Sequence, residues 1–369
     1  MEIKNGLLIL CMRSARIRTY SMTDYSFLSA FESRETGTLT KINQILKSSS
    51  PHLYIMNVNN LNEVRKYQID SLGQPVLLQS GFTGISNSMN RPYIVHDSLI
   101  LYDEFIPDAS LKIHSLHTNS EERALPYGTT SLYDRFIDKN MGGLYANDSC
   151  IAFVYKYQDK IEFYDWQFNL KHTVDHQKTE PVIYQPETGT NMSPPKNILY
   201  YGSAYMGRNY LYTLYRGVTN RVFRSDSVPI YGGRSHVYGL TRDVLEVYEL
   251  DGQPICRFRF DDVSPAVFVV DEEQNRLIGY RGAYYDSLLV YQLQGLPKNG
   301  KRDLEPQKPT RHSSLPAVSP PERPKAFLQG ISFGGGRDVA PMYFVYEGRY
   351  GIYFPVIEIG KTIPMADKL

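Results

Sequence analysis

Apolar and polar positions alternate along this chain in a recurring six-residue pattern: apolar, any residue, apolar, aromatic, polar, apolar. Its copies are Ile17–Met22, Val64–Ile69, Leu111–Leu116, Ile161–Trp166, Leu245–Leu250 and Leu288–Leu293. An alternation of period two is typical of a strand with one buried face. The pattern therefore predicts six equivalent β-strands.

The aromatic position of the pattern sets the period of the repeat. We call these aromatic residues the anchors: Tyr20, Tyr67, His114, Tyr164, Tyr248 and Tyr291. Successive anchors lie 47, 47, 50, 84 and 43 residues apart. Short strands at a period in the forties are typical of a β-propeller. We predict an all-β fold, a six-bladed β-propeller of four-stranded antiparallel blades over residues 1–295.

Further strand-like runs surround each anchor. A second strand precedes most anchors, as at Ile151–Tyr155, and a third lies upstream of it, as at Leu144–Ala146. A fourth follows the anchor, as at Ile255–Phe260. By this assignment blade 1 begins at its second strand, Leu7–Leu10, and blade 6 ends with its third. We therefore expect the propeller to be incomplete at its N-terminus and to have a gap where the ring closes.

The composition changes after Leu293. Residues 296–326 are rich in proline and charge, which predicts an extended linker. Residues 327–369 form a C-terminal extension in which Met342–Tyr346 and Ile352–Ile359 are strand-like. The extension could fill the closure gap or form a poorly ordered appendage. We favour the appendage, because strand-like runs this short are weak evidence.

The repeats resemble the TolB-like six-bladed propeller family of Gram-negative bacteria over roughly residues 1–295. The resemblance is carried by Leu144–Trp166, Leu199–Arg216 and Val244–Leu293. It implies a place in the cell envelope, as a periplasmic protein or outer-membrane lipoprotein, because family members usually begin with an export signal and a first strand. This chain has neither, since Gly6–Leu10 is too short for a signal peptide, and as written it is expected to be cytoplasmic. The family brings no catalytic motif to transfer.

Charge and motifs exclude several functional classes. The net charge of +1 and the pI near 7.7 argue against nucleic-acid binding. No apolar run is long enough to form a transmembrane segment. The histidines form no zinc motif, and no cofactor motif is found, so we expect neither a metal nor a cofactor. The three cysteines are predicted to be buried thiols.

The longest connections between predicted strands should lie on one face of the propeller. They are Gly81–Arg91, Leu125–Asn140, Asp175–Asn197 and Gly217–Arg242. Loops from several blades converge there, which makes this face the expected binding site. The alternative is that these connections are tolerated surface insertions.

Two groups of residues on that face are candidate ligand-binding residues. Tyr231, Arg234, His236 and Tyr238 combine aromatic rings with a guanidinium group, which suits a sugar or a carboxylate. The second group comes from connections in separate blades and contains Glu104, Phe105, Asp159, Tyr284, Tyr285 and Asp286. Its carboxylates could hold a cation or act as an acid/base pair, or they could be ordinary exposed charges.

Two functions are compatible with this sequence. The first is a non-enzymatic binding or scaffold propeller that recognises a protein or glycan on its loop-rich face. The second is a propeller-type hydrolase or lyase that acts on a sugar or lactone at the channel mouth. Several Asp, Glu, Asn or His side chains converging at the mouth would favour the enzyme, and a mouth lined by tyrosine would favour binding. We expect the binding function, because no catalytic signature is found.

Overall fold

The computed structural model describes residues 1–11, 16–32, 43–57, 63–83, 85, 89–104, 110–126, 140–177, 182–184, 196–219, 221–222, 227–229, 236–238, 243–260, 264–280, 287–293, 296, 344–345 and 361–364. Within these residues the fold is all-β and is built mainly of antiparallel strands in sets of four. Two of these sets, residues 43–82 and 89–126, are joined into one eight-stranded sheet by a short parallel pairing of Lys47 and Ser48 with Tyr93 and Ile94. We number these four-stranded units 1 to 6 in chain order. Cys150 and Cys256 are buried free thiols, as predicted, but the prediction is wrong for Cys11, which is a half-buried free thiol.

Units 1 to 4 are each made of consecutive strands. Unit 1 contains β1 (Glu2–Lys4), β2 (Leu7–Cys11), β3 (Arg16–Ser21) and β4 (Phe27–Glu32). Unit 2 contains β5 (Asn43–Ser48), β6 (Leu53–Asn57), β7 (Glu63–Ile69) and β8 (Pro75–Phe82). Unit 3 contains β9 (Met89–Val95), β10 (Leu99–Glu104), β11 (Ser110–Ser115) and β12 (Ser120–Pro126). Unit 4 contains β13 (Gly142–Ala146), β14 (Ile151–Tyr155), β15 (Lys160–Tyr164) and β16 (Leu170–Asp175).

Units 5 and 6 are interrupted in sequence. Unit 5 contains β17 (Ile198–Met206), β18 (Tyr210–Thr219), β21 (Val244–Glu249) and β22 (Pro254–Phe260), with β26 (Phe344–Val345) added at the edge of β22. A separate hairpin, β19 (Ser227–Pro229) and β20 (His236–Tyr238), lies between β18 and β21 in the chain. Unit 6 contains β23 (Val267–Asp271), β24 (Arg276–Tyr280), β25 (Ser287–Gln292) and β27 (Lys361–Pro364).

The anchors occupy the third strand of every unit, as the repeat predicts. Each anchor lies opposite a leucine or isoleucine of the second strand, for example Tyr20 opposite Leu8 and Tyr248 opposite Leu211. In units 1 to 5 the register with the fourth strand shifts at the step just before the anchor. Such a bulge bends the outer strand at the same level in each unit. The prediction of equivalent anchor strands is confirmed.

The sequence predicted a missing strand at each end of the repeat region, and both predictions are wrong. Unit 1 does have an innermost strand, because Glu2–Lys4 pairs with Leu7–Ile9 in β2. Unit 6 does have a fourth strand, since Lys361–Pro364 pairs antiparallel with Ser287–Val290. Residues 344–345 of the predicted strand Met342–Tyr346 pair with β22 instead. The other residues of the predicted linker and extension, apart from residue 296, lie outside the described residues.

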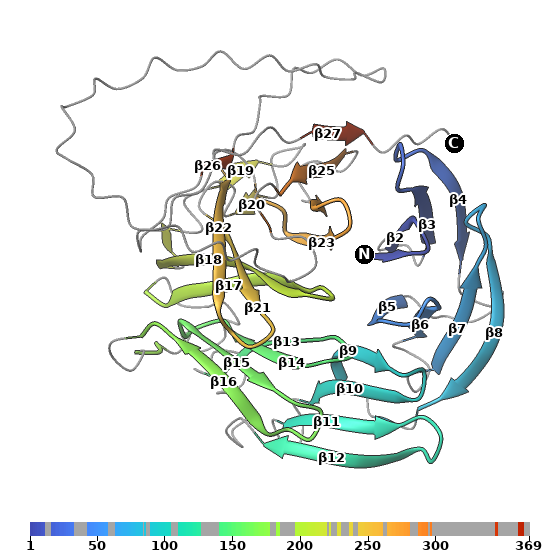
Figure 1. Ribbon diagram of the computed structural model, residues 1–369, viewed down its shortest axis with the longest axis horizontal. Coiled ribbons are helices and arrows are strands. Elements are labelled where there is room, and N and C mark those ends of the chain that lie inside the picture. Colours follow the sequence, from blue (N-terminus) through green and yellow to red (C-terminus); the bar gives the residue numbers. More distant parts are fainter. Residues whose placement is uncertain are drawn as a thin grey trace, which may run out of the picture.

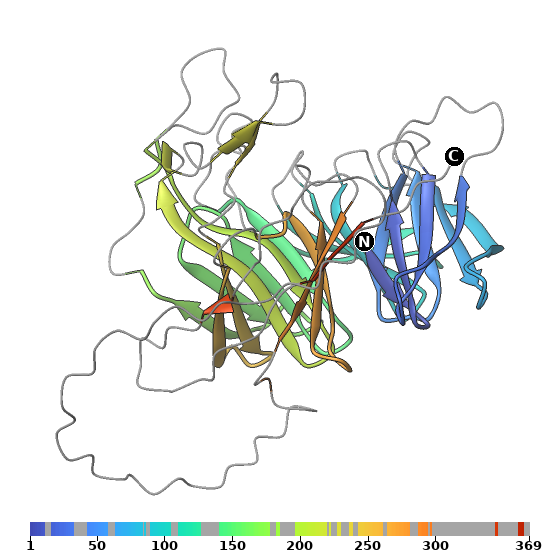
Figure 2. The ribbon, with the colours of Figure 1, turned by 90° about the horizontal axis from the view of Figure 1, so that it is seen from above.

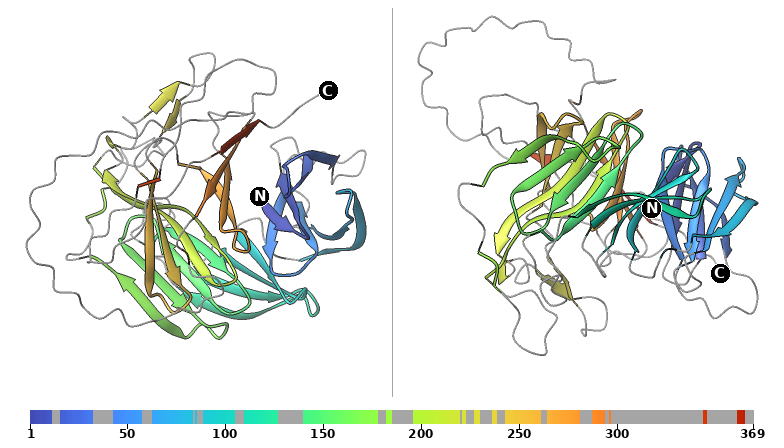
Figure 3. Two further views of the ribbon diagram at one scale, coloured as in Figure 1. Left: turned by 45° about the horizontal axis from the view of Figure 1, so that its top comes forward. Right: turned by 90° about the horizontal axis from the view of Figure 1, so that it is seen from below.

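Apolar side chains pack between successive units. One buried cluster joins units 1 and 2 through residues such as Ile9 and Ile55, and another joins units 4 and 5 through Phe163 and Tyr248. Similar clusters lie between the remaining neighbours. Unit 6 packs against unit 1 through Ile278 and Leu8. The units thus follow one another around the molecule, and β23 contacts β1 (Figures 1 and 3).

The connections have the predicted asymmetry. The turns between first and second strands and between third and fourth strands are short, as in the turn from Asp70 to Gln74. The long connections follow β4, β12, β16 and β18, and antiparallel order places all four at one end of the units. We call this the loop-rich end. The β19–β20 hairpin stands off the units on that side (Figure 2). The predicted loop Gly81–Arg91 is shorter than expected, because its ends belong to β8 and β9.

Candidate functional site

The innermost strands of units 2 to 6 line an open cavity of about 600 Å³. Its walls come from β5, β9, β13, β17 and β23, which lie around the centre in Figure 1. Small residues on these strands leave the space open, and they include Gly142, Gly143, Gly202, Ser203 and Ala204. Larger side chains at these positions would fill the volume. The cavity is therefore a consequence of which residues the inner strands carry.

Strand β17 is irregular where it borders the cavity. Its pairing with β18 shifts in register between Tyr201 and Ala204. Gly202 and Ser203 lie in this bulge and form part of the cavity wall. A side chain at Gly202 would collide with the guanidinium of Arg216, since an added Cβ would lie 2.6 Å from its Nη2 atom. The glycine thus makes room for the arginine at the wall.

Three basic side chains line the cavity: Lys47, Lys156 and Arg216. The Nζ atom of Lys47 lies 4.8 Å from the ring centre of Tyr205 and 5.9 Å from that of Tyr145. Backbone bonds fix Lys156 between two units: its N–H donates to Met141 at 2.7 Å, and its carbonyl accepts from Tyr200 at 2.9 Å. The Nζ atom of Lys156 lies 5.1 Å from the ring centre of Tyr157, so both lysines lie beside a tyrosine ring.

Arg216 is fixed by a buried carboxylate. Its Nε atom donates to Asp243 Oδ1 at 2.9 Å, and Asp243 is only 1% exposed. The hydroxyl of Ser264 donates to the other oxygen of Asp243 at 2.8 Å. A buried carboxylate needs such partners to remain charged. Asp243 therefore orients the guanidinium.

Tyr201 connects the cavity wall to a second polar region between units 4 and 5. Its hydroxyl donates to Asp159 Oδ1 at 3.1 Å, and the hydroxyl of Tyr215 donates to Oδ2 at 3.3 Å. His176 Nδ1 lies 3.5 Å from Asp159 Oδ1. The hydrogen bond that Asp159 accepts from the His176 ring raises the pKa of His176 above its ordinary value. We call these four residues the Asp159 cluster.

Glu246 extends this polar region toward the outer strands. It is 1% exposed, accepts a bond from the hydroxyl of Tyr248 at 2.6 Å, and forms an ion pair with Arg257. Burial raises the pKa of the Glu246 carboxyl. The guanidinium of Arg257 also lies 5.5 Å from the ring centre of Tyr215. Glu246 and Asp159 therefore share the same aromatic surroundings.

The position of Glu246 belongs to the repeat. It lies two residues before the anchor Tyr248, on the same face of the strand, and the anchor hydroxyl bonds to it. Glu162 has the same relation to the anchor Tyr164, with a bond of 2.6 Å, and accepts a second bond from Tyr155. In units 1 to 3 the corresponding residues are basic: Arg18, Arg65 and Lys112. Buried carboxylates at this position thus mark units 4 and 5.

The described residues include four of the predicted site residues. Asp159 lies in the connection between β14 and β15 and is buried, 8% exposed, rather than an ordinary surface charge. Glu104 ends β10 and pairs with Lys112 at 2.6 Å, so its contacts lie within unit 3. Asp159 and Glu104 therefore bind different partners. His236 and Tyr238 lie in the short strand β20. The other predicted residues, Tyr231, Arg234, Phe105, Tyr284, Tyr285 and Asp286, lie outside the described residues.

Sequence reasoning missed the partners of Asp159 and the cations of the cavity. Tyr201, Tyr215 and Glu246 are far from Asp159 in sequence and lie on strands, where their rings and carboxylate match the ordinary alternation. The one usable signal was glycine inside strands, at Gly142, Gly143 and Gly202, since glycine in a strand often marks a close approach or an opening. It indicates the inner strands but not the charges beside them.

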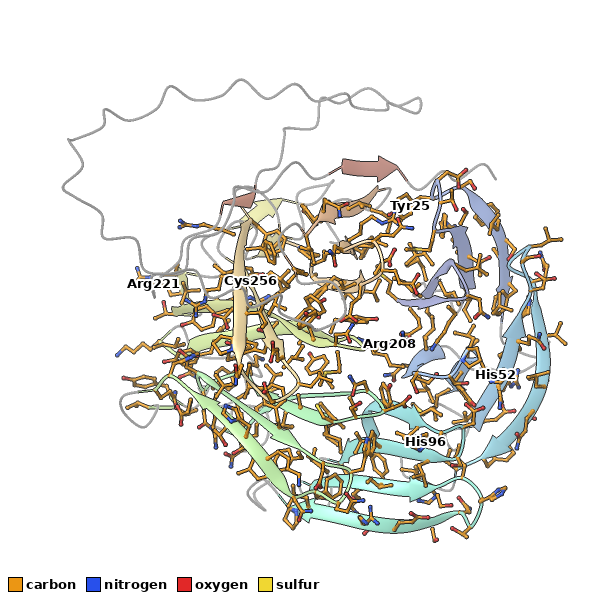
Figure 4. All side chains as sticks on the ribbon, in the orientation of Figure 1. Tyr25, His52, His96, Arg208, Arg221 and Cys256 are labelled. Atoms are coloured by element: carbon orange, nitrogen blue, oxygen red, sulfur yellow. The ribbon has the colours of Figure 1, made fainter. Side chains whose placement is uncertain are left out.

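No group of His, Cys, Asp and Glu suited to a metal ion is found among the residues that the structure describes. Figure 4 shows His52 and His96 on units 2 and 3, and neither lines the cavity. Within the described part of the chain, no helix has the length and apolarity needed to cross a bilayer.

No family model matches the chain, and no curated protein matches it.

Proposed function

We propose that the six units are the blades of a TolB-like six-bladed β-propeller whose central channel is the cavity. Support comes from the packing order, in which every unit shares a buried cluster with the next and unit 6 shares one with unit 1. The anchors add to this, because Tyr67 packs toward unit 1, Tyr248 toward unit 4 and Tyr291 toward unit 5. In each of these three blades the anchor thus packs against the preceding blade.

The propeller functions as a non-enzymatic binding protein whose ligand enters the cavity from the loop-rich end. The observation that carries this is the chemistry of the cavity wall. Tyrosines line it, at Tyr93, Tyr145 and Tyr201, and none of its described residues is Asp, Glu, Asn or His. Convergent carboxylates or histidines are what a hydrolase or lyase of this type would need at the mouth. Phenol rings with a few polar groups suit recognition instead.

A glycan is the ligand that this cavity favours over a protein. Its volume of about 600 Å³ lies within the usual range of small-molecule sites. A protein partner would need a broad surface rather than a cavity. Tyrosine rings can stack on sugar faces while their hydroxyls bond to sugar oxygens.

A glycan array probed with the folded protein tests this function. We expect the wild-type chain to bind at least one saccharide and the Ser203→Trp variant to lose that binding, because Ser203 lines the cavity and an indole there would occupy it. Lys171→Trp is the matched control, since Lys171 is exposed on the outer strand β16. Absence of any bound saccharide, or binding unchanged by Ser203→Trp, would refute the proposal.

One observation favours the alternative function of a hydrolase or lyase. Tyr201 touches both the cavity and Asp159, and Glu246 lies in the same polar region with a raised pKa. A ligand in the cavity would thus lie beside a tyrosine linked to a buried acid. Release of reducing ends from the bound saccharide, abolished by Asp159→Asn, would establish the enzyme.

A further inference from the structure

The charge of the cavity wall indicates which ligands the cavity prefers, and any such preference rests on the proposed binding function. Lys47, Lys156 and Arg216 line the cavity, and its described lining contains no carboxylate. Asp243 offsets one of the three charges through its pair with Arg216. Glu2 of the neighbouring β1 is paired with Lys4 at 3.3 Å. Among the described residues at the wall, positive charge therefore exceeds negative charge.

The basic side chains lie at two levels of the cavity. Lys156 follows β14 and Arg216 lies near the end of β18, so both belong to the loop-rich end. Lys47 is three residues further along β5 than Gln44, another lining residue. A strand rises about 3.3 Å per residue, which places Lys47 roughly 10 Å deeper. A ligand that enters from the loop-rich end meets positive charge first at the mouth and again in depth.

The low dielectric constant of the cavity wall strengthens the electrostatic attraction between these cations and an anionic ligand. Apolar and aromatic groups surround the three cations, and a cleft lined by charge of one sign concentrates its field on a ligand of the opposite sign. The rings of Tyr145 and Tyr205 hold Lys47, and Asp243 orients Arg216. Cations fixed before binding lose little conformational entropy when an anion arrives.

We propose that the cavity binds an acidic saccharide, a sugar that carries a carboxylate or a phosphate group. The anionic group interacts with Lys156 and Arg216 at the mouth or with Lys47 in depth, and the sugar ring lies against the tyrosines of the wall. Carboxylate and phosphate share the chemistry that lysine and arginine recognise.

An array of matched saccharide pairs tests this proposal, with uronates beside the corresponding hexoses and phosphorylated sugars beside unphosphorylated ones. We expect the acidic member of a pair to bind about ten-fold or more tightly than the neutral one. Lys47→Gln or Lys156→Gln should reduce this preference, and Lys171→Gln on the exposed outer strand should not. A higher salt concentration should weaken binding of the acidic sugars.

The outcomes separate this inference from the function on which it rests. Equal binding of acidic and neutral members, or a preference that both cavity variants retain, overturns the inference and leaves a saccharide-binding propeller. Absence of all saccharide binding by the folded protein overturns the binding function and the inference together. The uronate and phosphate arms show which anionic group the cavity takes.

Discussion

The interface between units 1 and 2 and the interface between units 4 and 5 have the same architecture but different chemistry. The apolar cluster of the first is aliphatic apart from its anchor, and consists of Leu7, Ile9, Ile17, Leu53, Ile55, Tyr67 and Ile69. The second contains smaller apolar residues such as Ala152, together with Tyr201 and the anchor Tyr248. Beside them lie the buried carboxylates of Asp159 and Glu246.

Burial of carboxylates carries a free-energy cost that an aliphatic interface avoids. The interface between units 1 and 2 holds a buried carboxylate in its innermost strand, where Glu2 pairs with Lys4 and the Lys4 ammonium donates to Ser50 of unit 2. Two positions before its anchor it carries Arg65 in place of a carboxylate. A carboxylate two residues before the anchor is therefore not required to join two units. The position of the polar interface beside the cavity gives another reason for its carboxylates, because Asp159 fixes the hydroxyl of Tyr201, whose ring is part of the cavity wall.

The largest effect should come from removing the anchor of the polar interface. Tyr248→Ala should destabilise the protein by about 3–5 kcal/mol, because it leaves a large cavity and deprives Glu246 of a hydrogen-bond donor. Tyr164→Ala, at the equivalent position of unit 4, should cost less, since Tyr164 is only half-buried. Urea denaturation measures both. Equal losses would show that the two anchors do not differ as their burial indicates.

Glu246→Ala should have the next largest effect, about 1–3 kcal/mol, because the hydroxyl of Tyr248 and the charge of Arg257 lose their buried partner. Glu246→Gln retains an acceptor for Tyr248 and should cost less. Chemical denaturation of both variants at one pH measures the difference. A gain in stability from Glu246→Ala would mean that the free-energy cost of burying the carboxylate exceeds the stabilisation from its hydrogen bond and ion pair.

A conservative change in the aliphatic interface should have a smaller effect. Ile55→Val should destabilise the protein by about 0.5–1.5 kcal/mol, through the loss of one methylene group from a 1% exposed side chain. The buried cluster around Ile55 contains no Asp, Glu or His, so the loss should be the same at pH 5 and pH 8. A pH-dependent loss measured by thermal melts would contradict the description of this cluster as apolar.

The smallest effect should be a pH dependence that belongs to the polar interface. The folded pKa of His176 is raised above its ordinary value of 6.5, so its contribution is fully present below that pH and disappears as pH rises through the folded pKa. His176→Gln should therefore destabilise the protein at pH 6 and have little effect at pH 8.5. The side chain is 42% exposed, and solvent screening keeps the effect below about 1 kcal/mol. Equal effects at both pH values would contradict the link to Asp159.

Titration of Glu246 should also lower the stability of the protein as pH rises, but over a lower pH range than titration of His176. Its raised pKa means that its stabilising contribution is present below its ordinary value of 4.5 and is lost as pH rises. Wild-type protein should therefore lose stability relative to Glu246→Gln on going from acid to neutral pH. Melting curves of both proteins over that range give the sign directly.

Sequence patterns predicted the fold well where burial has a period. The anchors were found because Tyr20, Tyr67 and Tyr291 repeat a strand pattern, and their strands are equivalent in the structure. Strand β1 was missed because it has three residues with charged ends, and β27 because it pairs with residues more than 70 positions earlier. Pairing over such a distance leaves no local signal.

The candidate site was less predictable. Asp159 was identified as a carboxylate in a connection, but its partners Tyr201 and Tyr215 are 42 and 56 residues away. Lys47 and Arg216 lie inside strands, where a charged residue ordinarily indicates a solvent-facing position. They face a cavity because of how neighbouring units are placed around them, and that placement leaves no local sequence pattern.

The fourth strand of unit 6 has a consequence for synthesis of the chain. Residues 287–290 of β25 have no strand to pair with on this edge until Lys361–Pro364 has been synthesised. Among the described strands, Lys361–Pro364 is the last that the ribosome adds. At about 5–20 residues per second, the delay is several seconds. During that time the nascent protein carries an open strand edge, to which the edge strands of other nascent chains can pair. We therefore expect this protein to be most prone to misassembly while it is still being translated.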